Sequence, residues 1–428
     1  MLLRILDASG APLERLCRRG EADLARVEPA VREILDRVQR EGDEALVTFA
    51  ARFEGRAQRP TEIEIPPGRV RAAAASVAAG TMEALRFAAG RIRAFHERAM
   101  ERERDLSFEE GGVELGQLVT PLASAGVYAP GGKARYPSTV LMAAVPAAVA
   151  GVAEVVLCSP SPTPEVLAAA SIAGVARVFD VGGAQAIAAM AFGTETIPAV
   201  DAIVGPGNLY VACAKKLVSG RCAIDGIAGP SEAVVLADDH AVPSRMAADL
   251  LTQAEHDEEA YAILVTTSRK LAAAVQVEVE RQVASLPRRA IAERSLADKG
   301  AILVAEDLDT AVSVCSRIAP EHLTIVTADP AGVLAKRPVA GCIFVGPDTP
   351  QTAGDYVAGP SHVLPTGGAA RFGAPLGVHH FLRRSSLVRY TSAALEAQAE
   401  PMTSLARLEG LEAHARAVEI RLARGPRT

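Results

Sequence analysis

Four short segments of the chain place histidines beside carboxylates or an amide, and they contain four of its 8 histidines. The segments are Gln253-Ala254-Glu255-His256, Pro320-Glu321-His322, Gly354-Asp355-Tyr356 with His362 following, and Glu409-Gly410-Leu411-Glu412-Ala413-His414. Such side chains bind Zn²⁺, Mn²⁺ or Co²⁺, and histidine exchanges protons near neutral pH. We therefore expect folding to gather them into one metal-containing catalytic site.

Gln253 and His256 are three residues apart in a helix predicted over 245–256. Residues at this spacing project from one helix face, so both could bind a single metal ion. A histidine that complements the dipole at a helix C-terminus explains the same spacing, and the pair alone favours that second interpretation. Neighbouring Glu255 and Asp257 point elsewhere and are expected to be solvated.

Glu321-His322 lies between a helix expected to end near Ala319 and a strand expected from Leu323. Here His322 can serve as a general base and Glu321 can orient water, although a polar loop is the simpler interpretation of the pair alone. Asp355 lies in a segment dense in glycine and proline, over 354–368. Long ordered loops of this kind often carry function, and a surface turn is the alternative.

Glu409 and His414 are five residues apart, which would place them about 140° apart on a continuous helix. Gly410 could break the helix and let both side chains face one pocket, whereas an exposed tail helix is the alternative. His379-His380 also invites a metal interpretation. Because neighbouring residues diverge on a helix or a strand, we expect this pair at the surface.

The middle of the chain alternates predicted strands with predicted helices. The expected strands cover 154–158, 176–180, 202–204, 233–236, 261–266, 301–304, 323–326 and 342–345. Helices are expected between them, among others over 139–151, 164–174, 183–192 and 209–218. This alternation predicts parallel sheets covered on both faces. The expected fold class is α/β, with two α/β units and helical segments at both ends.

Two glycine loops follow predicted strands, although the Gly-x-Gly-x-x-Gly fingerprint is absent from both units. Gly205-Pro206-Gly207-Asn208 follows the strand that ends at Val204, and Gly182-Gly183-Ala184-Gln185 follows the preceding strand. Such loops can bind a phosphate at a helix N-terminus. A tight turn, with Asn208 as the helix N-cap, is an equally good interpretation. Two loops in one sheet indicate a ligand at its carboxyl edge.

The composition is that of an ordinary globular protein. At 428 residues, with 49% hydrophobic and 22% charged residues, the chain is long enough for two or more domains. Its net charge of −6 argues against a general nucleic-acid surface. The apolar stretch over 139–152 is shorter than a membrane span, and we expect no secretion signal. Six dispersed cysteines without a Cys-x-x-Cys pair favour a reducing cytosol.

Taken together, these segments resemble the histidinol dehydrogenase family. The resemblance runs in the family's order through 128–142, 182–187, 205–208, 225–232, 253–256, 320–323, 354–356, 361–366 and 409–414. It implies two incomplete Rossmann-like parallel-sheet domains without the standard glycine fingerprint. It also implies an NAD-dependent, zinc-containing enzyme that oxidises L-histidinol to L-histidine in two hydride transfers through the aldehyde.

The resemblance further implies roles for individual residues. Glu321 would activate water and His322 would be the general base. The implied zinc ligands are Gln253, His256, Asp355 and His414. The implied substrate contacts are Ser231, Glu409, His322 and the zinc ligands. The implied NAD contacts are Tyr128, Gln185 and Asn208.

The expected domains follow from the same resemblance. They are an N-terminal helical segment (1–21), a metal and substrate domain (22–127 with 233–376), an NAD domain (128–232) and a C-terminal helical tail (377–428). The family is a homodimer in which this tail reaches the partner's site. One departure from the family pattern is Val378-His379-His380-Phe381, where we expect more acidic residues; no implied ligand changes.

Three alternatives remain open from the sequence. A family relative could oxidise a different small alcohol, although Asp355, Glu409 and His414 favour histidinol. A metal-dependent hydrolase could use Glu321 to activate water, but it has no need of two glycine loops on one sheet. A non-catalytic binding protein would leave the repeated base and ligand residues unexplained.

Overall fold

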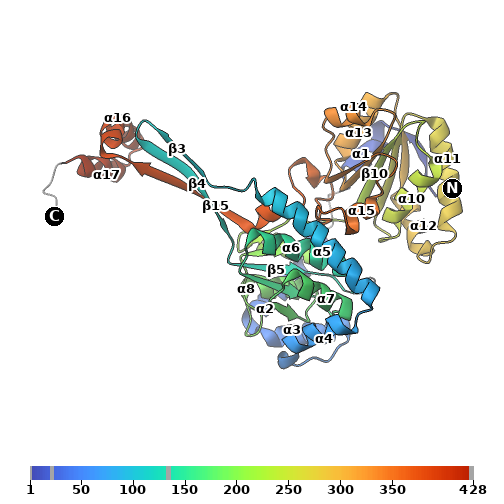
Figure 1. Ribbon diagram of the computed structural model, residues 1–428, viewed down its shortest axis with the longest axis horizontal. Coiled ribbons are helices and arrows are strands. Elements are labelled where there is room, and N and C mark those ends of the chain that lie inside the picture. Colours follow the sequence, from blue (N-terminus) through green and yellow to red (C-terminus); the bar gives the residue numbers. More distant parts are fainter. Residues whose placement is uncertain (1, 20–23, 132–135, 424–428) are drawn as a thin grey trace. The chain divides into compact units, whose positions relative to one another are not determined.

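The computed structural model describes residues 2–19, 24–131 and 136–423 (Figure 1). The chain divides into two compact units. Unit 1 consists of Met1–Arg98 and Leu122–Phe381, and unit 2 of Ala99–Pro121 and Leu382–Thr428. Within the described ranges, no helix is both long and apolar enough to cross a membrane.

Unit 1 is built on two six-stranded sheets with the same central strand order. Sheet 1 has the order β2-β7-β6-β5-β8-β9, and sheet 2 the order β1-β12-β11-β10-β13-β14. All strand pairs are parallel except β2 with β7. In each sheet the first of five central strands lies in the middle and later strands extend to either side. Such an order creates a switch point at which α/β sheets bind ligands.

The strands are short apolar runs, which suit burial on both faces. Sheet 1 contains β2 (Glu64–Ile65), β5 (Ser124–Tyr128), β6 (Glu154–Cys158), β7 (Arg177–Phe179), β8 (Ala202–Val204) and β9 (Ala223–Ile224). Sheet 2 contains β1 (Ile5–Asp7), β10 (Glu232–Ala237), β11 (Tyr261–Thr266), β12 (Ala301–Val304), β13 (His322–Val326) and β14 (Cys342–Val345). The predicted α/β class with two parallel sheets is confirmed.

Helices cover both sheets, as the crossover connections of parallel strands require. Those associated with sheet 1 are α2 (Leu24–Glu41), α3 (Asp43–Glu54), α4 (Pro67–Ser76), α6 (Pro137–Ala150), α7 (Pro164–Ala173), α8 (Gly183–Phe192) and α9 (Leu209–Val218). Those associated with sheet 2 are α1 (Gly10–Cys17), α10 (Pro243–Ala254), α11 (Arg269–Val283), α12 (Arg289–Asp298), α13 (Leu308–Ile318), α14 (Pro330–Ala335) and α15 (Gln351–Tyr356). Short 3-10 turns are η1 (Pro60–Glu62), η2 (Ala369–Arg371) and η3 (Val378–Phe381).

The expected grouping of residues 22–127 with 233–376 differs from the packing. Val31, Leu46 and Phe49 of α2 and α3 belong to the same buried cluster as Val156 and Ile203 of sheet 1. Figure 1 shows these N-terminal helices, in blue, beside the green helices of sheet 1. An amphipathic helix reveals which of its faces is buried but not which sheet it covers. Only the packing therefore assigns α2 and α3 to sheet 1.

The N-terminal segment, expected to be helical, begins instead with a strand. Ile5, Leu6 and Asp7 of β1 pair with Ile302, Leu303 and Val304 of β12. Three residues are too few to show the period-two alternation that predicts a strand. The first residues of the chain thereby become the edge of sheet 2, and α1 follows them onto the same core.

Unit 2 contains a three-stranded antiparallel sheet and two helices. The sheet has the order β15-β4-β3, formed by β15 (Leu382–Tyr390), β4 (Val113–Pro121) and β3 (Leu106–Glu110). Helices α16 (Ser392–Leu408) and α17 (Glu412–Leu422) follow, whereas α5 (Ala79–Met100) continues from unit 1. The tail was expected to be helical only. Its long strand was missed because it mixes polar and apolar residues without regular alternation.

Candidate functional site

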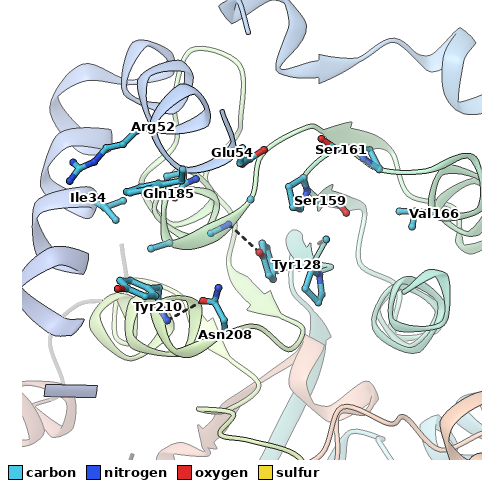
Figure 2. Close-up of a pocket in the computed structure, with 18 of the residues that line it drawn as sticks. Ile34, Arg52, Glu54, Tyr128, Ser159, Ser161, Val166, Gln185, Asn208 and Tyr210 are labelled. Atoms are coloured by element: carbon cyan, nitrogen blue, oxygen red, sulfur yellow. Dashed lines mark hydrogen bonds between the residues drawn. The ribbon is translucent and has the colours of Figure 1, made fainter. Parts of the chain in front are cut away.

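A cavity of about 920 Å³ lies at the carboxyl ends of β5, β6, β7 and β8 (Figure 2). Its lining includes Tyr128, Gln185 and Asn208, the three residues implied to contact NAD. Each comes from a different part of sheet 1: the last residue of β5, the first turns of α8, and the residue before α9. The predicted position of a ligand, at the carboxyl edge of the sheet, coincides with this cavity.

The glycine loop before α8 is fixed by Tyr128. The Gly183 N–H donates a hydrogen bond to the Tyr128 hydroxyl at 3.1 Å. Burial raises the pKa of Tyr128 to about 12, so its phenol stays protonated and can still donate a hydrogen bond into the cavity. The neighbouring Gln185 side chain is 3% exposed and also lines the cavity.

Asn208 is the N-cap of α9, as one of the two interpretations of its loop predicted. Its Oδ1 accepts hydrogen bonds from the N–H groups of Tyr210 and Val211 at 3.1 and 3.2 Å. The cap holds the side-chain oxygen in place, and the amide nitrogen remains as a donor for a ligand in the cavity.

The second glycine loop is fixed by a buried ion pair that no local sequence pattern predicts. Lys215 and Asp225 side chains are 3% and 4% exposed and form an ion pair. Asp225 accepts a hydrogen bond from the Gly205 N–H at 2.7 Å, and Lys215 donates one to the Gly205 carbonyl at 2.9 Å. Both backbone groups of Gly205 are thereby held beside the cavity.

A second group of functional side chains lies at the amino-terminal edge of sheet 2. His322 is the first residue of β13, and Glu321 precedes it. The side chains of His322 and Glu321 are 8% and 7% exposed. The His322 Nδ1 is 3.1 Å from the Glu232 carbonyl oxygen, so Nδ1 carries the proton and donates it. Its Nε2 then holds a lone pair and lies 3.8 Å from Oδ1 of Asp355.

Burial sets the protonation of this group. It raises the pKa of Glu321 well above the ordinary value for a carboxyl group, and the charge of Glu232 adds to the rise. A hydrogen bond from the Ser231 hydroxyl opposes it. Burial lowers the pKa of His322, which keeps the imidazole neutral, and Asp355 opposes this shift. A neutral imidazole and a carboxyl group with a raised pKa suit proton transfer.

Three of the four implied metal ligands, Gln253, His256 and Asp355, belong to unit 1. Gln253 is in the last turn of α10, and His256 follows this helix by two residues. Burial raises the pKa of Asp355, and the neighbouring His322, 3.8 Å away, opposes the rise. Burial lowers the pKa of His256 and so favours the neutral imidazole that metals bind.

The surroundings of the Gln253 side chain are consistent with binding to a metal ion. Gln253 is 2% exposed, and its Nε2 has no hydrogen-bond partner in the described structure. A buried amide normally has partners, and exchanging the positions of its oxygen and nitrogen would place the oxygen, a metal ligand, at this unpartnered position. Among the described residues, no group of three or more His, Cys, Asp or Glu side chains is arranged to hold a metal.

His362, whose role the sequence left open, links the two halves of unit 1. Its Nδ1 lies 2.8 Å from the Asp355 carbonyl oxygen, and its Nε2 lies 3.1 Å from the Thr139 hydroxyl of α6. With Nδ1 as donor, Nε2 accepts from Thr139. His362 also lines a small cavity of about 160 Å³ together with His322 and Phe344. It thus holds Asp355 in place through the backbone.

Two further residues that the sequence analysis singled out, Glu409 and His414, belong to the other compact unit of the chain, unit 2. Both are exposed. Gly410, with φ +76°, ends α16 after Glu409, so the expected break between the two helices is confirmed. The loop over 132–135, part of the family resemblance, lies outside the described residues.

The expectation that His379-His380 lies at the surface was wrong. Both residues are only partly exposed, and their ring centroids are 4.1 Å apart. The imidazole of His96 is 1% exposed and lies near His379. Burial lowers the pKa of His96 and of His380 to about 4. The 3-10 turn η3 folds these histidines inward, which a short polar segment does not reveal.

Comparisons with known proteins agree with this architecture. A sequence model of the family described as histidinol dehydrogenase matches residues 17–422. The chain is 51% identical to histidinol dehydrogenase of Syntrophotalea carbinolica over 417 residues, 96% of each chain. It is also 51% identical to that of Aquifex aeolicus over 411 residues, again 96% of each.

A solved structure shows the same fold. The crystal structure of histidinol dehydrogenase from Elizabethkingia anophelis superposes with a TM-score of 0.92 at 32% identity, and covers 98% of both chains. Sequence and structure therefore agree over almost the entire length. The chain belongs to the histidinol dehydrogenase family.

Proposed function

We propose that this protein oxidises L-histidinol to L-histidine in two NAD-dependent steps through L-histidinaldehyde, with zinc at its active site. The observation that carries the proposal is the buried Glu321–His322 pair, in which the Glu232 carbonyl leaves His322 Nε2 free to take a proton. An oxidoreductase of alcohols and aldehydes needs such a base, and the family relationship names the substrate.

The large cavity of sheet 1 supports NAD as the oxidant. Its volume of about 920 Å³ lies within the range typical of small-molecule sites. Tyr128, Gln185 and Asn208 would contact the dinucleotide with a hydroxyl and two amides. Bound NAD would supply the hydride acceptor for both oxidations. The loops at Gly183 and Gly205 would replace the missing fingerprint, because each is fixed by a hydrogen bond from its own N–H.

The zinc site would use ligands from two subunits. Gln253, His256 and Asp355 offer an amide oxygen, a neutral imidazole and a carboxylate, a donor set that zinc accepts. The partner subunit's His414 would complete it. When bound, zinc would orient the amino and imidazole groups of the substrate. Ser231 and the partner subunit's Glu409 would add polar contacts to the substrate.

The residues of this chain then divide the proton transfers between them. In the first step the alcohol loses a hydride and a proton, and His322 Nε2 takes the proton of the hydroxyl group. In the second step the aldehyde adds water. Glu321, in its ionised form, would accept a proton from that water before a second hydride leaves the hydrate, and its raised pKa makes this carboxylate a stronger base. Burial of both side chains keeps bulk water from the reactive aldehyde.

Unit 2 supports a homodimer as the functional assembly. Its strands and helices expose large apolar side chains, which on soluble proteins mark contact surfaces. These residues are Leu106, Phe108, Leu118, Val388, Tyr390, Leu405, Leu408, Leu411 and Ile420. A second copy of this chain that covered them would also bring the α16–α17 turn, with Glu409 and His414, to a neighbouring site.

The cysteines support a reducing compartment, and we infer the cytosol. All six, Cys17, Cys158, Cys213, Cys222, Cys315 and Cys342, are free thiols, and four are buried. Burial raises the pKa of Cys222 and Cys342 to about 11, so these thiols are not reactive nucleophiles.

One assay tests the proposal directly. Purified protein is incubated with L-histidinol and NAD, with and without a chelator, and NADH and histidine are counted. The proposal predicts two NADH per histidine and loss of turnover after chelation, restored by zinc. No turnover of histidinol beside turnover of another small alcohol would reject the substrate assignment. Chelator-resistant turnover would reject the metal.

A further inference from the structure

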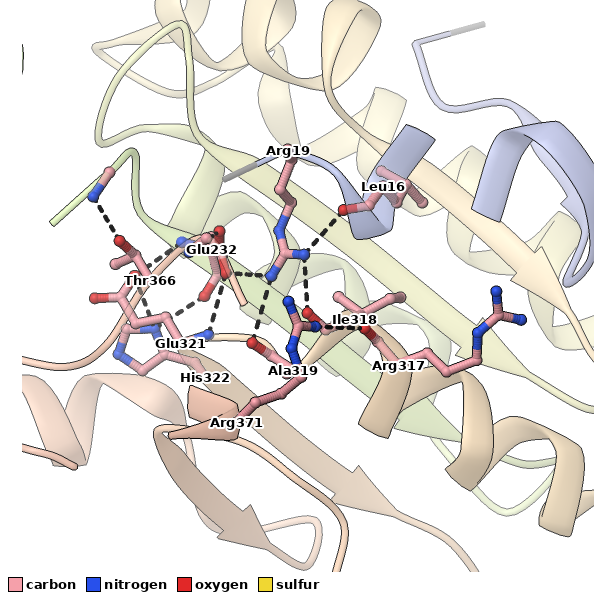
Figure 3. Close-up of polar contacts among 12 residues, drawn as sticks. Leu16, Arg19, Glu232, Arg317, Ile318, Ala319, Glu321, His322, Thr366 and Arg371 are labelled. Carbon is pink, nitrogen blue, oxygen red and sulfur yellow. Dashed lines mark hydrogen bonds and ion pairs between the residues drawn. The ribbon is translucent and has the colours of Figure 1, made fainter. Parts of the chain in front are cut away.

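A buried ion pair adjoins the Glu321–His322 pair in sheet 2. The Arg19 and Glu232 side chains are 1% and 2% exposed, and Arg19 Nη2 lies 2.5 Å from Glu232 Oε2. Such a pair adds little net stability, because the desolvation of two charges offsets their attraction. The pair is therefore expected to act mainly through the groups that it holds in place (Figure 3).

Glu232 uses its main chain and its side chain to hold both residues of the pair. Its N–H donates to Oε2 of Glu321 at 2.8 Å, and its carbonyl accepts from His322 Nδ1 at 3.1 Å. Its carboxylate accepts from the Glu321 N–H at 3.3 Å and from the Gly367 N–H at 2.7 Å. One residue thus sets the rotamer of Glu321, the tautomer of His322 and the path of the chain before β13.

Arg19 holds Glu232 and the end of helix α13 together. Its Nη1 donates to the carbonyls of Leu16 and Ile318 at 2.9 and 2.8 Å, and its Nη2 donates to Glu232. Ala319 follows Ile318 in a left-handed conformation, φ +47°, which a residue with a side chain adopts only when its surroundings impose it. The Arg19 guanidinium group thereby fixes the turn at Ala319, and Glu321 lies two residues after this turn.

We propose that Arg19 and Glu232 are positioning residues for the Glu321–His322 pair, a proposal that rests on the catalytic role of that pair. Arg19 belongs to the segment after α1, far from the pair in sequence. It brings the ends of α1, α13 and the start of β10 to one point. Lysine would keep the charge but lose the fork, since a single ammonium cannot replace the guanidinium at two carbonyls and a carboxylate together.

The test compares Arg19→Lys with a matched control, Arg177→Lys, in full-length zinc-loaded enzyme. Like Arg19, Arg177 donates hydrogen bonds to a carboxylate, that of Glu64, and to a backbone carbonyl, that of Thr196. Arg177 lies in sheet 1 and not in sheet 2. Steady-state kcat and KM for histidinol are measured, together with the rise in Tm on adding NAD. Loss of orientation predicts a fall in kcat of about 10- to 100-fold for Arg19→Lys.

The remaining readouts separate positioning from folding. For Arg19→Lys, the NAD-dependent rise in Tm should stay close to the parent, because the NAD cavity is built on sheet 1. KM for histidinol should change less than kcat, because the zinc site rather than the Glu321–His322 pair would anchor the substrate. Arg177→Lys should keep the parental kcat. Folded Arg19→Lys with kcat within about twofold of the parent would overturn the proposal. A parent without histidinol turnover would instead refute the proposed function.

A double variant covers the case in which Arg19→Lys does not fold. Arg19→Met with Glu232→Gln leaves no unpaired buried charge and should fold. It should still lose kcat, because an amide oxygen cannot accept all the donors that the carboxylate accepts. Full kcat in this folded variant overturns the proposal. Failure of both variants to fold assigns the pair a structural role only, and also overturns it.

Discussion

At the level of single residues, the proposed catalytic role of Glu321 and His322 depends on their protonation states, which their buried surroundings determine. The Glu232 carbonyl fixes the proton of His322 on Nδ1, which leaves Nε2 with a lone pair for the proposed role as general base. Burial favours the neutral form of both Glu321 and His322. The residue types were visible in the sequence, but their protonation depends on neighbours that only the fold brings together.

His322→Asn should slow the first oxidation by about 10²- to 10⁴-fold, because no other group replaces the lost base. Asparagine keeps a donor toward the Glu232 carbonyl, so the variant should fold and retain zinc. NADH formation from histidinol in a single turnover, with metal content measured on the same sample, checks this. Parental rates in a zinc-loaded variant would remove His322 from the mechanism.

Glu321→Gln should affect the second oxidation more than the first. The amide oxygen can still accept the Glu232 N–H, so the packing is kept, but no proton can be taken from water. We expect oxidation of supplied histidinaldehyde to fall by about 10²-fold or more. Glu278→Gln, a change in the exposed pair with Arg281, serves as the control. Equal slowing of both oxidations would contradict the assigned role of Glu321.

At the level of elements, two turns after strands of sheet 1 line the cavity that we propose binds NAD. Gly205 has φ +115°, and a Cβ placed on it would lie 2.1 Å from the Tyr128 carbonyl oxygen. Tyr128 ends β5 and Gly205 follows β8, so the glycine lets two neighbouring strands end side by side. The close approach, rather than a fingerprint of three glycines, is what the backbone requires here.

Gly205→Ala should therefore disrupt the NAD site while leaving sheet 2 intact. A Cβ at this position must push the β5 and β8 ends apart and displace Tyr128 and Asn208. We expect the rise in Tm with NAD to disappear, and a loss of roughly 1–3 kcal/mol from the strained conformation alone. Gly220→Ala, at φ +100° with open space, controls for backbone strain. NAD protection retained in Gly205→Ala would contradict the cavity assignment.

Much of the α/β core could be predicted because its signals are local. Strands such as Glu154–Cys158 and Tyr261–Thr266 are apolar runs between turns, and they occur at the expected residues. The strands β1 and β15 were missed for two different reasons. β1 is too short to show a pattern, and β15 pairs with a strand far away in the sequence. Long-range pairing is not encoded in any window of the chain.

For the candidate site, the residue types could be predicted from the sequence, but only some of the contacts between them could. Tyr128, Gln185 and Asn208 do line one cavity, and Asp355 does lie near His322. The Arg19–Glu232 pair could not be predicted from the sequence, because its members are 213 residues apart. Buried ion pairs of this kind have no local pattern, and Arg19 is preceded by an ordinary amphipathic helix.

At the level of the whole molecule, buried histidines make stability depend on pH. The pKa of His96 and His380 is lowered to about 4 in the folded protein, against 6.5 in an unfolded chain. Below pH 6.5 the unfolded state therefore binds more protons, and stability falls until about pH 4. Each unit of pKa difference corresponds to ~1.4 kcal/mol.

The expected result is a Tm that is constant above pH 7 and falls steadily between pH 6.5 and 4.5. His96→Leu should fold and reduce this fall, since it removes one buried group that must stay neutral. His240→Gln, at an exposed histidine, should leave the curve unchanged. The measurement is thermal unfolding across this pH range. Parallel curves for the parent and His96→Leu would contradict the argument.

At the level of the assembly, we propose that the catalytic site is complete only in a homodimer, because His414 and Glu409 belong to unit 2 and the other proposed site residues to unit 1. Subunit complementation tests this most directly. Inactive His322→Asn and inactive His414→Asn chains are co-expressed with different tags, and the mixed dimers are isolated. Supply in trans predicts that one of two sites in each mixed dimer has both native residues, so turnover returns to about half of the parental value. Mixed dimers that remain as inactive as either parent variant would contradict the account.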